Sequence, residues 1–354
     1  MKKIIVIPGD GIGQEITACA VKVLEKIDQK FNIGLQFETR DAGGTSYEKF
    51  GTPLTDEALT ACKNADGVLF GAVGGKKWDS LPVHLRPEKA IFGLRKGLGL
   101  FANLRPTKVY PELINSSPLK PELVNGADLL IVRELVGGIY FGPRCESETK
   151  DGVEQAWDTE IYSVPEIERI TKLAFETAKK SRGKLTSVDK ANVLAASRLW
   201  RKVVNDMAKN YPDVELNHLY VDNAAMQLVL NPAQFDIIVT NNIFGDILSD
   251  EAAVIGGSIG LMPSASIGEL TSLYEPIHGS APDIAGQDKA NPMGTILSAA
   301  MLLRYSLNRE DAAQAIESAI EKTLADGWRT PDIFSDGFKK VGTNRVTEII
   351  CDFI

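Results

Sequence analysis

The chain is poor in the residues that build disulfide frameworks and zinc sites. Its 354 residues include only four cysteines and three histidines. The cysteines lie far apart with no CxxC spacing, at Cys19, Cys62, Cys145 and Cys351. This distribution argues against a zinc site or a disulfide framework, and it is typical of a protein from a reducing compartment.

Long runs of one charge sign and long apolar runs are also missing. The net charge is −8, from 39 basic and 47 acidic residues, and no five consecutive residues carry the same charge. An extended nucleic-acid surface is therefore not expected. The first apolar run, Ile4 to Ile7, ends at Pro8 and is too short for a signal peptide or a membrane span. We expect a cytoplasmic protein that binds neither nucleic acid nor a membrane.

Short β-branched runs alternate with amphipathic helical stretches along most of the chain. With 354 residues, 44% of them hydrophobic, the chain can bury a large core, and its length favours two domains. The alternation starts with Lys3–Ile7, Gln14–Phe31 and Leu35–Thr39 and predicts an α/β fold with a substantially parallel core sheet. Residues 110–121 carry three prolines and predict a loop near a domain crossing, without a regular element.

The alternation is interrupted once and then resumes. Residues 137–161 predict an antiparallel arm that leaves the main sheet and can pair with a partner subunit. Ser163, followed by Glu166 three residues later, predicts the capping-box start of a helix. Further strands are predicted at Leu185–Val188, Leu216–Val221, Phe235–Val239 and Leu273–Ile277, and further helices at Ala195–Lys209, Asn223–Leu230 and Phe244–Ile255.

A glycine motif, Gly9-Asp10-Gly11-Ile12-Gly13, lies between a predicted strand and a predicted helix. A Rossmann dinucleotide-binding turn needs a third glycine where Gln14 stands, and an acid about 20 residues further on. Neither requirement is met well. We interpret the motif as a tight glycine turn that lines a cleft.

Two aspartates, Asp246 and Asp250, are four residues apart near the start of a predicted helix. Residues at this spacing share a helix face, and no basic residue lies between them to neutralise the pair. A divalent cation and a favourable interaction with the helix dipole are both open interpretations. Asp222 favours the metal site, because it follows a predicted strand at the end where ligands of α/β sheets bind.

Four more residues occupy positions typical of a ligand site. Lys190 and Arg133 end predicted strands, Arg105 follows an extended run, and Tyr140 lies in a glycine-rich turn. Arginine binds carboxylates through paired hydrogen bonds, and lysine and tyrosine can transfer protons. Taken singly, each is as well explained as a solvated or packing residue. Together with Arg95 and the aspartates, they predict a site for a metal-chelated dicarboxylic acid.

The segment His278–Gly286 follows a predicted strand and contains two glycines, a proline and an acid. Its backbone amides can hold adenine and phosphate. Asp283 can accept a hydrogen bond from a ribose 2′-hydroxyl and repel a 2′-phosphate. This interpretation predicts NAD rather than NADP, and the alternative is a structural surface loop.

Six motifs together extend over most of the chain: Gly71–Gly75, Phe101–Pro106, Arg133–Gly142, Asp189–Val193, Asn241–Glu251 and Tyr274–Gly286. They resemble the isocitrate/isopropylmalate dehydrogenase family, and within it the members that act on 3-isopropylmalate. Several of the motifs are shared with dehydrogenases of isocitrate, homoisocitrate, tartrate and D-malate, so these substrates remain alternatives.

The resemblance implies NAD-dependent and divalent-metal-dependent oxidative decarboxylation of 3-isopropylmalate to 4-methyl-2-oxopentanoate and CO₂ in leucine biosynthesis. It also implies a homodimer with shared active sites. The implied fold is not a Rossmann fold but an isopropylmalate dehydrogenase-like α/β fold, in which a mixed sheet runs through two domains. These domains would comprise residues 1–100 and 253–354, and residues 101–252, which carry the dimer-forming β arm at 137–161.

The resemblance also assigns roles to residues. Tyr140 and Lys190 would be catalytic. The substrate would be bound by Arg95, Arg105, Arg133, Asp222 and Glu88, with an apolar pocket formed by Ile91, Phe92 and Val193. Mg²⁺ or Mn²⁺ would be held by Asp246 and Asp250 together with Asp222 contributed by the partner chain. Lys190 would also come from the partner chain. NAD would be bound by Glu275, His278, Gly279, Ser280, Ala281, Asp283, Ile284 and Asn291.

A protein of a different class, a non-catalytic NAD-binding regulatory subunit, is a further alternative. Such subunits usually lack a metal-binding acid or the proton-transferring pair. This chain retains Tyr140, Lys190, Asp222, Asp246 and Asp250. The sequence therefore favours an enzyme.

Overall fold

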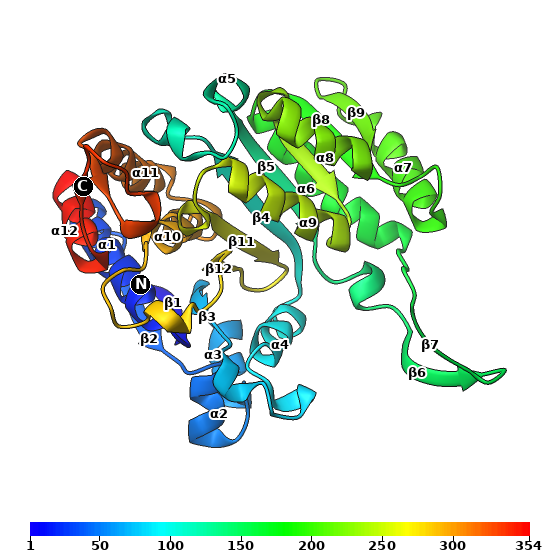
Figure 1. The fold of residues 1–354 in the computed structure, drawn as a ribbon, viewed down its shortest axis with the longest axis horizontal. Helices are drawn as coiled ribbons and strands as arrows, with labels where there is room; N and C mark the ends of the chain where they lie inside the picture. The colour runs from blue at the N-terminus through cyan, green and yellow to red at the C-terminus, as the bar shows by residue number, and fades with distance from the viewer. The chain divides into compact units, whose positions relative to one another are not determined.

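The computed structural model describes residues 1–354, and the chain divides into two compact units (Figure 1). The first unit comprises Met1–Leu100, Tyr110–Pro118 and Gly256–Ile354. The second comprises Phe101–Val109 and Leu119–Ile255. In the main sheet strands of both units parallel pairs dominate, and each unit has one antiparallel pair among them. The predicted α/β class with a mixed sheet is confirmed.

The first unit has the strand order β2-β1-β3-β12-β11. All neighbours in this series are parallel except β11, which runs antiparallel to β12. Every residue of β3 is buried, as expected for a parallel strand covered on both faces. The strands span Lys2–Gly9 (β1), Leu35–Thr39 (β2), Gly67–Ala72 (β3), Pro263–Gly268 (β11) and Leu273–Pro276 (β12).

Four long helices of the first unit pack closely together (Figure 1). They are α1 (Gly13–Phe31), α10 (Met293–Tyr305), α11 (Glu310–Ala325) and α12 (Thr343–Phe353). Helix α10 contacts β3, β11 and β12, and it is buried almost all round because its sequence is apolar on every face. Three shorter helices are α2 (Gly44–Phe50), α3 (Asp56–Lys63) and α4 (Lys89–Gly97).

The second unit has the strand order β4-β5-β10-β8-β9, with only the β4–β5 pair antiparallel. Helices α6 and α7 contact each other, as do α8 and α9, and all four also contact strands. The strands are β4 (Leu100–Lys108), β5 (Asp128–Glu134), β8 (Lys184–Asp189), β9 (Glu215–Tyr220) and β10 (Ile237–Thr240). The helices are α5 (Pro121–Val124), α6 (Val164–Lys180), α7 (Ala195–Ala208), α8 (Val221–Leu230) and α9 (Asn242–Ile255).

The start of α6 confirms the predicted capping box. The Ser163 backbone N–H donates to Glu166 Oε2 at 2.7 Å, and Pro165 occupies the first turn, where its missing N–H costs nothing. Ile167, Ile170 and Ala174 form part of the buried face. Local sequence and tertiary packing agree on this helix.

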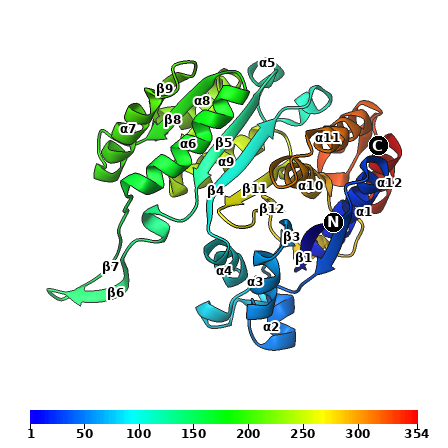
Figure 2. The same ribbon diagram turned by 180° about the vertical axis from the view of Figure 1, so that it is seen from behind.

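The predicted antiparallel arm is present. Strand β6 (Arg144–Lys150) pairs only with β7 (Val153–Asp158), and nearly all of their residues are exposed. Both strands extend away from the rest of their unit (Figures 1 and 2). Their pairing with a partner subunit remains a prediction.

Some local predictions were wrong. The segment 110–121 contains a 3₁₀ helix, Pro111–Ser116, and α5 begins at Pro121, because proline is well accommodated in a first helical turn. Strand β9 ends at Tyr220, and α8 begins at Val221, two residues before the predicted start. Strand β11 was not predicted, since its sequence PSASIG contains only one residue type with a strong strand preference, Ile267. None of the helices combines the length and the apolar character needed to cross a bilayer.

Candidate active site

Helix α9 carries the two acidic residues at the centre of the candidate site. The Asn241 side chain accepts a hydrogen bond from Phe244 N at 2.9 Å and so satisfies one of the free amides at the helix start. Asp246 and Asp250 lie one turn apart on the same face. Their side chains are 35% and 66% exposed, so both are open to a ligand.

Arg133, at the end of β5, is buried against α9. Its Nη1 is 2.5 Å from Asp246 Oδ1, and Nε and Nη2 donate to Asn242 Oδ1 at 3.2 and 2.9 Å. This close approach requires Gly245, because a Cβ there would lie 2.6 Å from Arg133 Cγ. The contacts fix the plane of the guanidinium beside the carboxylate.

Arg105 reaches the same helix face from β4. Its Nη1 donates to Asp250 Oδ1 at 3.0 Å and to Ser249 Oγ at 2.8 Å, and it lies 3.7 Å from Asp246 Oδ1. Its Nε donates to Asn103 Oδ1 at 2.7 Å. Two arginines therefore converge on the two carboxylates.

Tyr140 completes this group of side chains. It lies in a short 3₁₀ turn, Gly138–Tyr140, and its hydroxyl donates to Asp246 Oδ2 at 3.1 Å. Burial raises the pKa of Tyr140, and the neighbouring Asp246 carboxylate raises it further. The hydroxyl is therefore protonated at neutral pH and can serve as a proton donor. The structure thus brings together Arg105, Arg133, Tyr140, Asp246 and Asp250.

The donor set of this cluster fits a divalent cation in part. Carboxylate oxygens suit Mg²⁺ or Mn²⁺. However, no group of three His, Cys, Asp or Glu side chains that could hold a metal comes together in the chain. Asp222, in the first turn of α8, does not join Asp246 and Asp250.

Asp222 pairs instead with Lys190, at 2.5 Å from Nζ to Oδ1, and this hydrogen bond lowers the pKa of Asp222. Lys190 directly follows β8. The turn is anchored by buried Asp189, which accepts two hydrogen bonds from Arg201 at 2.8 and 2.9 Å. Val193 is 62% exposed three residues further on. Lys190, Asp222 and Val193 form a second group of predicted site residues. The Lys190 and Asp222 side chains are hydrogen-bonded to each other and not to Asp246 or Asp250.

In the first unit, helix α4 positions four predicted site residues, Glu88, Ile91, Phe92 and Arg95. Arg95 Nη2 lies 3.7 Å from Glu275 Oε1. Arg95 Nε is buried and has no hydrogen-bond partner. A buried guanidinium donor without a partner is a place where an anionic oxygen can bind. Phe92 is 42% exposed and places an apolar ring beside this guanidinium, with the Arg95 Cζ atom 6.0 Å from the ring centroid.

The segment 278–286, also in the first unit, is anchored at Ser280 and Ile284 and exposed between them. Ser280 is buried, its hydroxyl donates to the Gly74 carbonyl at 2.8 Å, and its own carbonyl accepts from Ile12 N at 2.8 Å. Gly279, Ala281 and Asp283 are exposed, while Ile284 packs against the small core of Ile12, Ile16 and Ala290.

Two predicted cofactor-binding residues, His278 and Asn291, differ in whether their side chains have hydrogen-bonding atoms left for a ligand. Burial lowers the pKa of His278, which is therefore neutral at neutral pH, and its Nε2 has no hydrogen-bond partner. Both ends of the Asn291 amide are already used, by Asp332 at 3.0 Å and by Met293 N at 3.0 Å. His278 is thus the better placed of the two to bond a ligand.

Sequence reasoning missed several residues that hold these groups in place. Asp10 is buried and accepts hydrogen bonds from Gly44 N, Gly74 N and Thr45 N at 2.8, 2.9 and 2.8 Å. The position of Asp10 within the glycine turn Gly9–Gly13 is the feature of the sequence that could have indicated this role. Asn242, which orients Arg133, carries no local signal that separates it from its neighbours.

The chain thus combines two mixed α/β units with a site in which Arg105, Arg133 and Tyr140 surround the paired carboxylates of α9. The chain belongs to the isocitrate/isopropylmalate dehydrogenase family, whose profile matches residues 3–350. It is 59% identical over 350 residues to the 3-isopropylmalate dehydrogenase of Clostridium acetobutylicum, with 98% of each chain covered. It is 56% identical over 352 residues to that of Aquifex aeolicus, with 99% of this chain and 96% of the relative covered.

Solved structures give the same fold. An isocitrate dehydrogenase from Methylococcus capsulatus is 36% identical with a TM-score of 0.88, over 100% of this chain and 99% of the other. A beta-decarboxylating dehydrogenase from Thermococcus kodakarensis is 37% identical with a TM-score of 0.82, over 100% of this chain and 96% of the other. The predicted family is confirmed.

Proposed function

We propose that this chain catalyses the NAD-dependent and divalent-metal-dependent oxidation and decarboxylation of 3-isopropylmalate to 4-methyl-2-oxopentanoate and CO₂ in leucine biosynthesis. The observation that carries the proposal is the side-chain cluster on α9, in a chain 59% identical along its length to a 3-isopropylmalate dehydrogenase. Two guanidinium groups, a protonated tyrosine and two carboxylates suit a metal-chelated dicarboxylate.

In this proposal, Arg95, Arg105 and Arg133 bind the substrate carboxylates. Asp246 and Asp250 hold Mg²⁺ or Mn²⁺ with Asp222 of a second copy, which accounts for the separation of Asp222 from the α9 pair within one chain. A bound cation would supply Lewis acidity at the C2 hydroxyl oxygen, and bound NAD would supply the hydride acceptor.

The protein side chains then move two protons. Lys190, relayed by water or Asp222, takes the proton of the C2 hydroxyl as the hydride departs. After the bond to CO₂ breaks, Tyr140 gives its proton to C3, a role consistent with its raised pKa. Ile91, Phe92 and Val193 form the apolar pocket for the isopropyl group, with Glu88 beside it.

NAD binds along the segment 278–286, with Glu275 and Asn291 beside it. The neutral His278 has a ring nitrogen without a partner, and the exposed backbone of Gly279 and Ala281 is available to the nucleotide. Ser280 contributes chiefly by anchoring the segment, since its hydroxyl is bonded to Gly74.

The working unit in this proposal is a homodimer. Helices α8 and α9 contact each other and expose large apolar side chains, at Met226, Val229, Leu230, Ile247 and Val254. Exposed apolar side chains gathered on adjacent elements are typical of a protein interface. A second copy is the partner that also explains why Asp222 and Lys190 lie apart from the α9 cluster.

The direct test compares kcat/KM for 3-isopropylmalate, isocitrate, D-malate and tartrate with NAD and Mn²⁺. We expect 3-isopropylmalate to be preferred by more than about tenfold. Isocitrate would bury a carboxylate, and tartrate a hydroxyl, without a partner in the pocket of Ile91, Phe92 and Val193, and D-malate would leave that pocket unfilled. A higher kcat/KM for any of the other three acids would assign the chain to that substrate instead.

The cofactor is predicted to be NAD, with NADP used less well by more than about tenfold in kcat/KM. Asp283 is exposed in the open segment, and a 2′-phosphate beside its carboxylate would be repelled. Asp283→Ser is expected to reduce the ratio of kcat/KM with NAD to kcat/KM with NADP. The control is Asp311→Ser, at an exposed aspartate on α11 of the same unit, which is expected to leave this ratio unchanged. Equal use of the two cofactors by the unmodified protein contradicts the assigned role of Asp283.

A further inference from the structure

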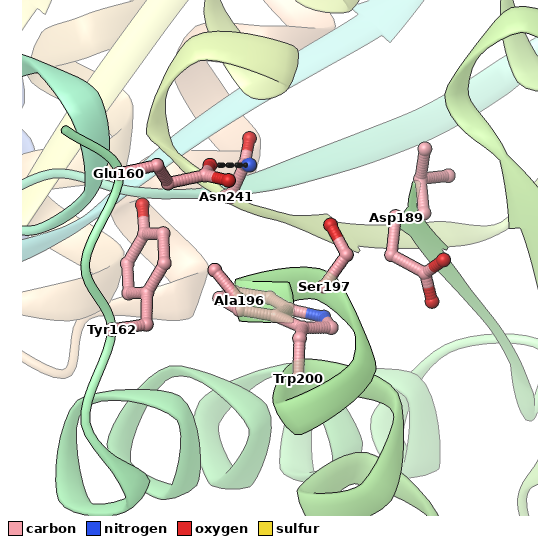
Figure 3. Close-up of a pocket in the computed structure, with 8 residues that line it drawn as sticks. Glu160, Tyr162, Asp189, Ala196, Ser197, Trp200 and Asn241 are labelled. Carbon is pink, nitrogen blue, oxygen red and sulfur yellow. Dashed lines mark hydrogen bonds between the residues drawn. The ribbon is translucent and has the colours of Figure 1, made fainter. Parts of the chain in front are cut away.

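Tyr162 lies at the point where the chain returns from the arm to α6, and it is 7% exposed. Its ring packs edge-to-face on Trp200, with ring centroids 5.5 Å apart. Both rings line a small pocket (Figure 3), together with Glu160, Val188, Asp189, Ala196, Ser197 and Asn241. Figure 3 shows the Tyr162 hydroxyl on the side of Glu160 and Asn241, the residue that precedes α9.

The Tyr162 hydroxyl joins two segments that are distant in the sequence. It accepts a hydrogen bond from Asn242 N at 2.9 Å, in the first turn of α9, and it donates to Glu134 Oε2 at 3.3 Å. Glu134 also accepts from Val136 N and Gly137 N at 2.9 and 2.8 Å. Burial and the nearby carboxylate raise the pKa of Tyr162 far above its ordinary value, so it stays a neutral donor.

Both segments lead directly to the α9 cluster. Asn242 Oδ1 accepts from Arg133 Nε and Nη2, and Asn242 Nδ2 donates to the Gly137 carbonyl at 3.1 Å. Gly137 begins the turn that presents Tyr140. A Cβ on Gly137 would lie 2.7 Å from Tyr162 Cε1, so the turn is packed directly against the Tyr162 ring.

A second hydrogen bond ties the same return segment to the start of α9. Glu160 Oε1 accepts from Asn241 Nδ2 at 2.7 Å, while Asn241 Oδ1 accepts from Phe244 N. Figure 3 shows this bond beside the Tyr162 hydroxyl. The base of the arm therefore holds the first turn of α9 at two successive residues, Asn241 and Asn242.

We propose that Tyr162 is a positioning residue that sets the Arg133 guanidinium and the Tyr140 turn relative to the carboxylates of α9. Tyr162 does not touch the α9 carboxylates in the structure and acts through Glu134 and Asn242. This inference rests on the proposed function, since it assigns Tyr162 to the reaction of 3-isopropylmalate.

The test is Tyr162→Phe, which keeps the ring on Trp200 and removes only the hydroxyl. Errors of an ångström in placing reacting groups cost up to about a hundredfold in rate. We therefore expect kcat/KM for 3-isopropylmalate to fall by about tenfold or more, and the KM for NAD to stay within about twofold. The matched control is Tyr211→Phe, which removes a hydroxyl from a tyrosine stacked on Phe175, at a centroid distance of 4.6 Å.

Each outcome separates the alternatives. A purely structural role for Tyr162 predicts a lower melting temperature without a selective loss toward 3-isopropylmalate, and that result overturns the inference. If Tyr162→Phe does not fold, Gly137→Ala disturbs the packing of the Tyr140 turn on the Tyr162 ring instead and is expected to give the same selective loss. Absence of turnover by the unmodified protein contradicts the proposed function. Normal turnover by both the unmodified protein and the variant contradicts only the role of Tyr162.

Discussion

Asp246→Asn is expected to lower kcat by more than about a hundredfold and to weaken Mn²⁺ binding by at least about tenfold. The substitution keeps the size of the side chain and its hydrogen bond with Tyr140, but it removes the charge that binds the cation and pairs with Arg133. Mn²⁺ titrations, followed by activity and by direct binding, measure both effects.

The control for this prediction is Asp206→Asn, which removes one carboxylate charge from the same unit, at an exposed position paired with Lys202 and Lys209. It is expected to leave metal dependence unchanged. The metal assignment is wrong if protein stripped with EDTA turns over at its full rate without added cation, or if Asp246→Asn binds Mn²⁺ normally while remaining folded.

Mixed dimers are expected to recover activity from two inactive variants. Lys190→Ala removes the proposed proton acceptor and Tyr140→Phe the proposed proton donor, so each homodimer is inactive. If Lys190 serves the site of the other copy, one of the two sites in each heterodimer retains both residues. Random mixing makes about half of the dimers heterodimers, which gives about a quarter of the unmodified activity.

The arrangement of Lys190 and Asp222 supplies the control. The two residues are hydrogen-bonded within one chain, so both would be delivered to the same partner site. Heterodimers of Lys190→Ala with Asp222→Asn then carry one lesion in each site and should stay inactive. If subunit exchange is verified and Lys190→Ala with Tyr140→Phe also shows no recovery, the active site belongs to a single chain.

The sequence predicts the fold class and most of the helices and strands, because periodic burial and helix capping produce recognisable patterns in the local sequence. Helix α6 shows both, with a capping box at Ser163 and buried residues at helical spacing. Strand β11 contains only one residue with a strong strand preference, Ile267. Its six residues PSASIG become a strand through pairing with β12, a neighbour that no local pattern specifies.

The candidate site shows the same division. The shared face of Asp246 and Asp250 follows from their spacing on a helix, and the position of Arg133 follows from the end of a strand. The positions of the residues that orient these side chains cannot be predicted from such local patterns. Tyr162 and Asn242 are 80 residues apart, and Glu134 and Tyr162 are 28 apart, so their bonds exist only once the sheet and α9 are assembled.

Every face of helix α9 has a structural or proposed functional role, so we expect few amino-acid substitutions to be tolerated along it. One face packs on β5 and β10, a second presents Asp246 and Asp250, and a third exposes Ile247 and Val254 for the proposed partner. Surface positions of an ordinary helix accept most substitutions within about 0.5 kcal/mol. In a saturation mutagenesis library selected for growth without leucine, we expect the exposed positions of α9 to tolerate as few substitutions as its buried positions. Ile247 and Val254 should reject charged residues most strongly, although water reaches both in the separate chain.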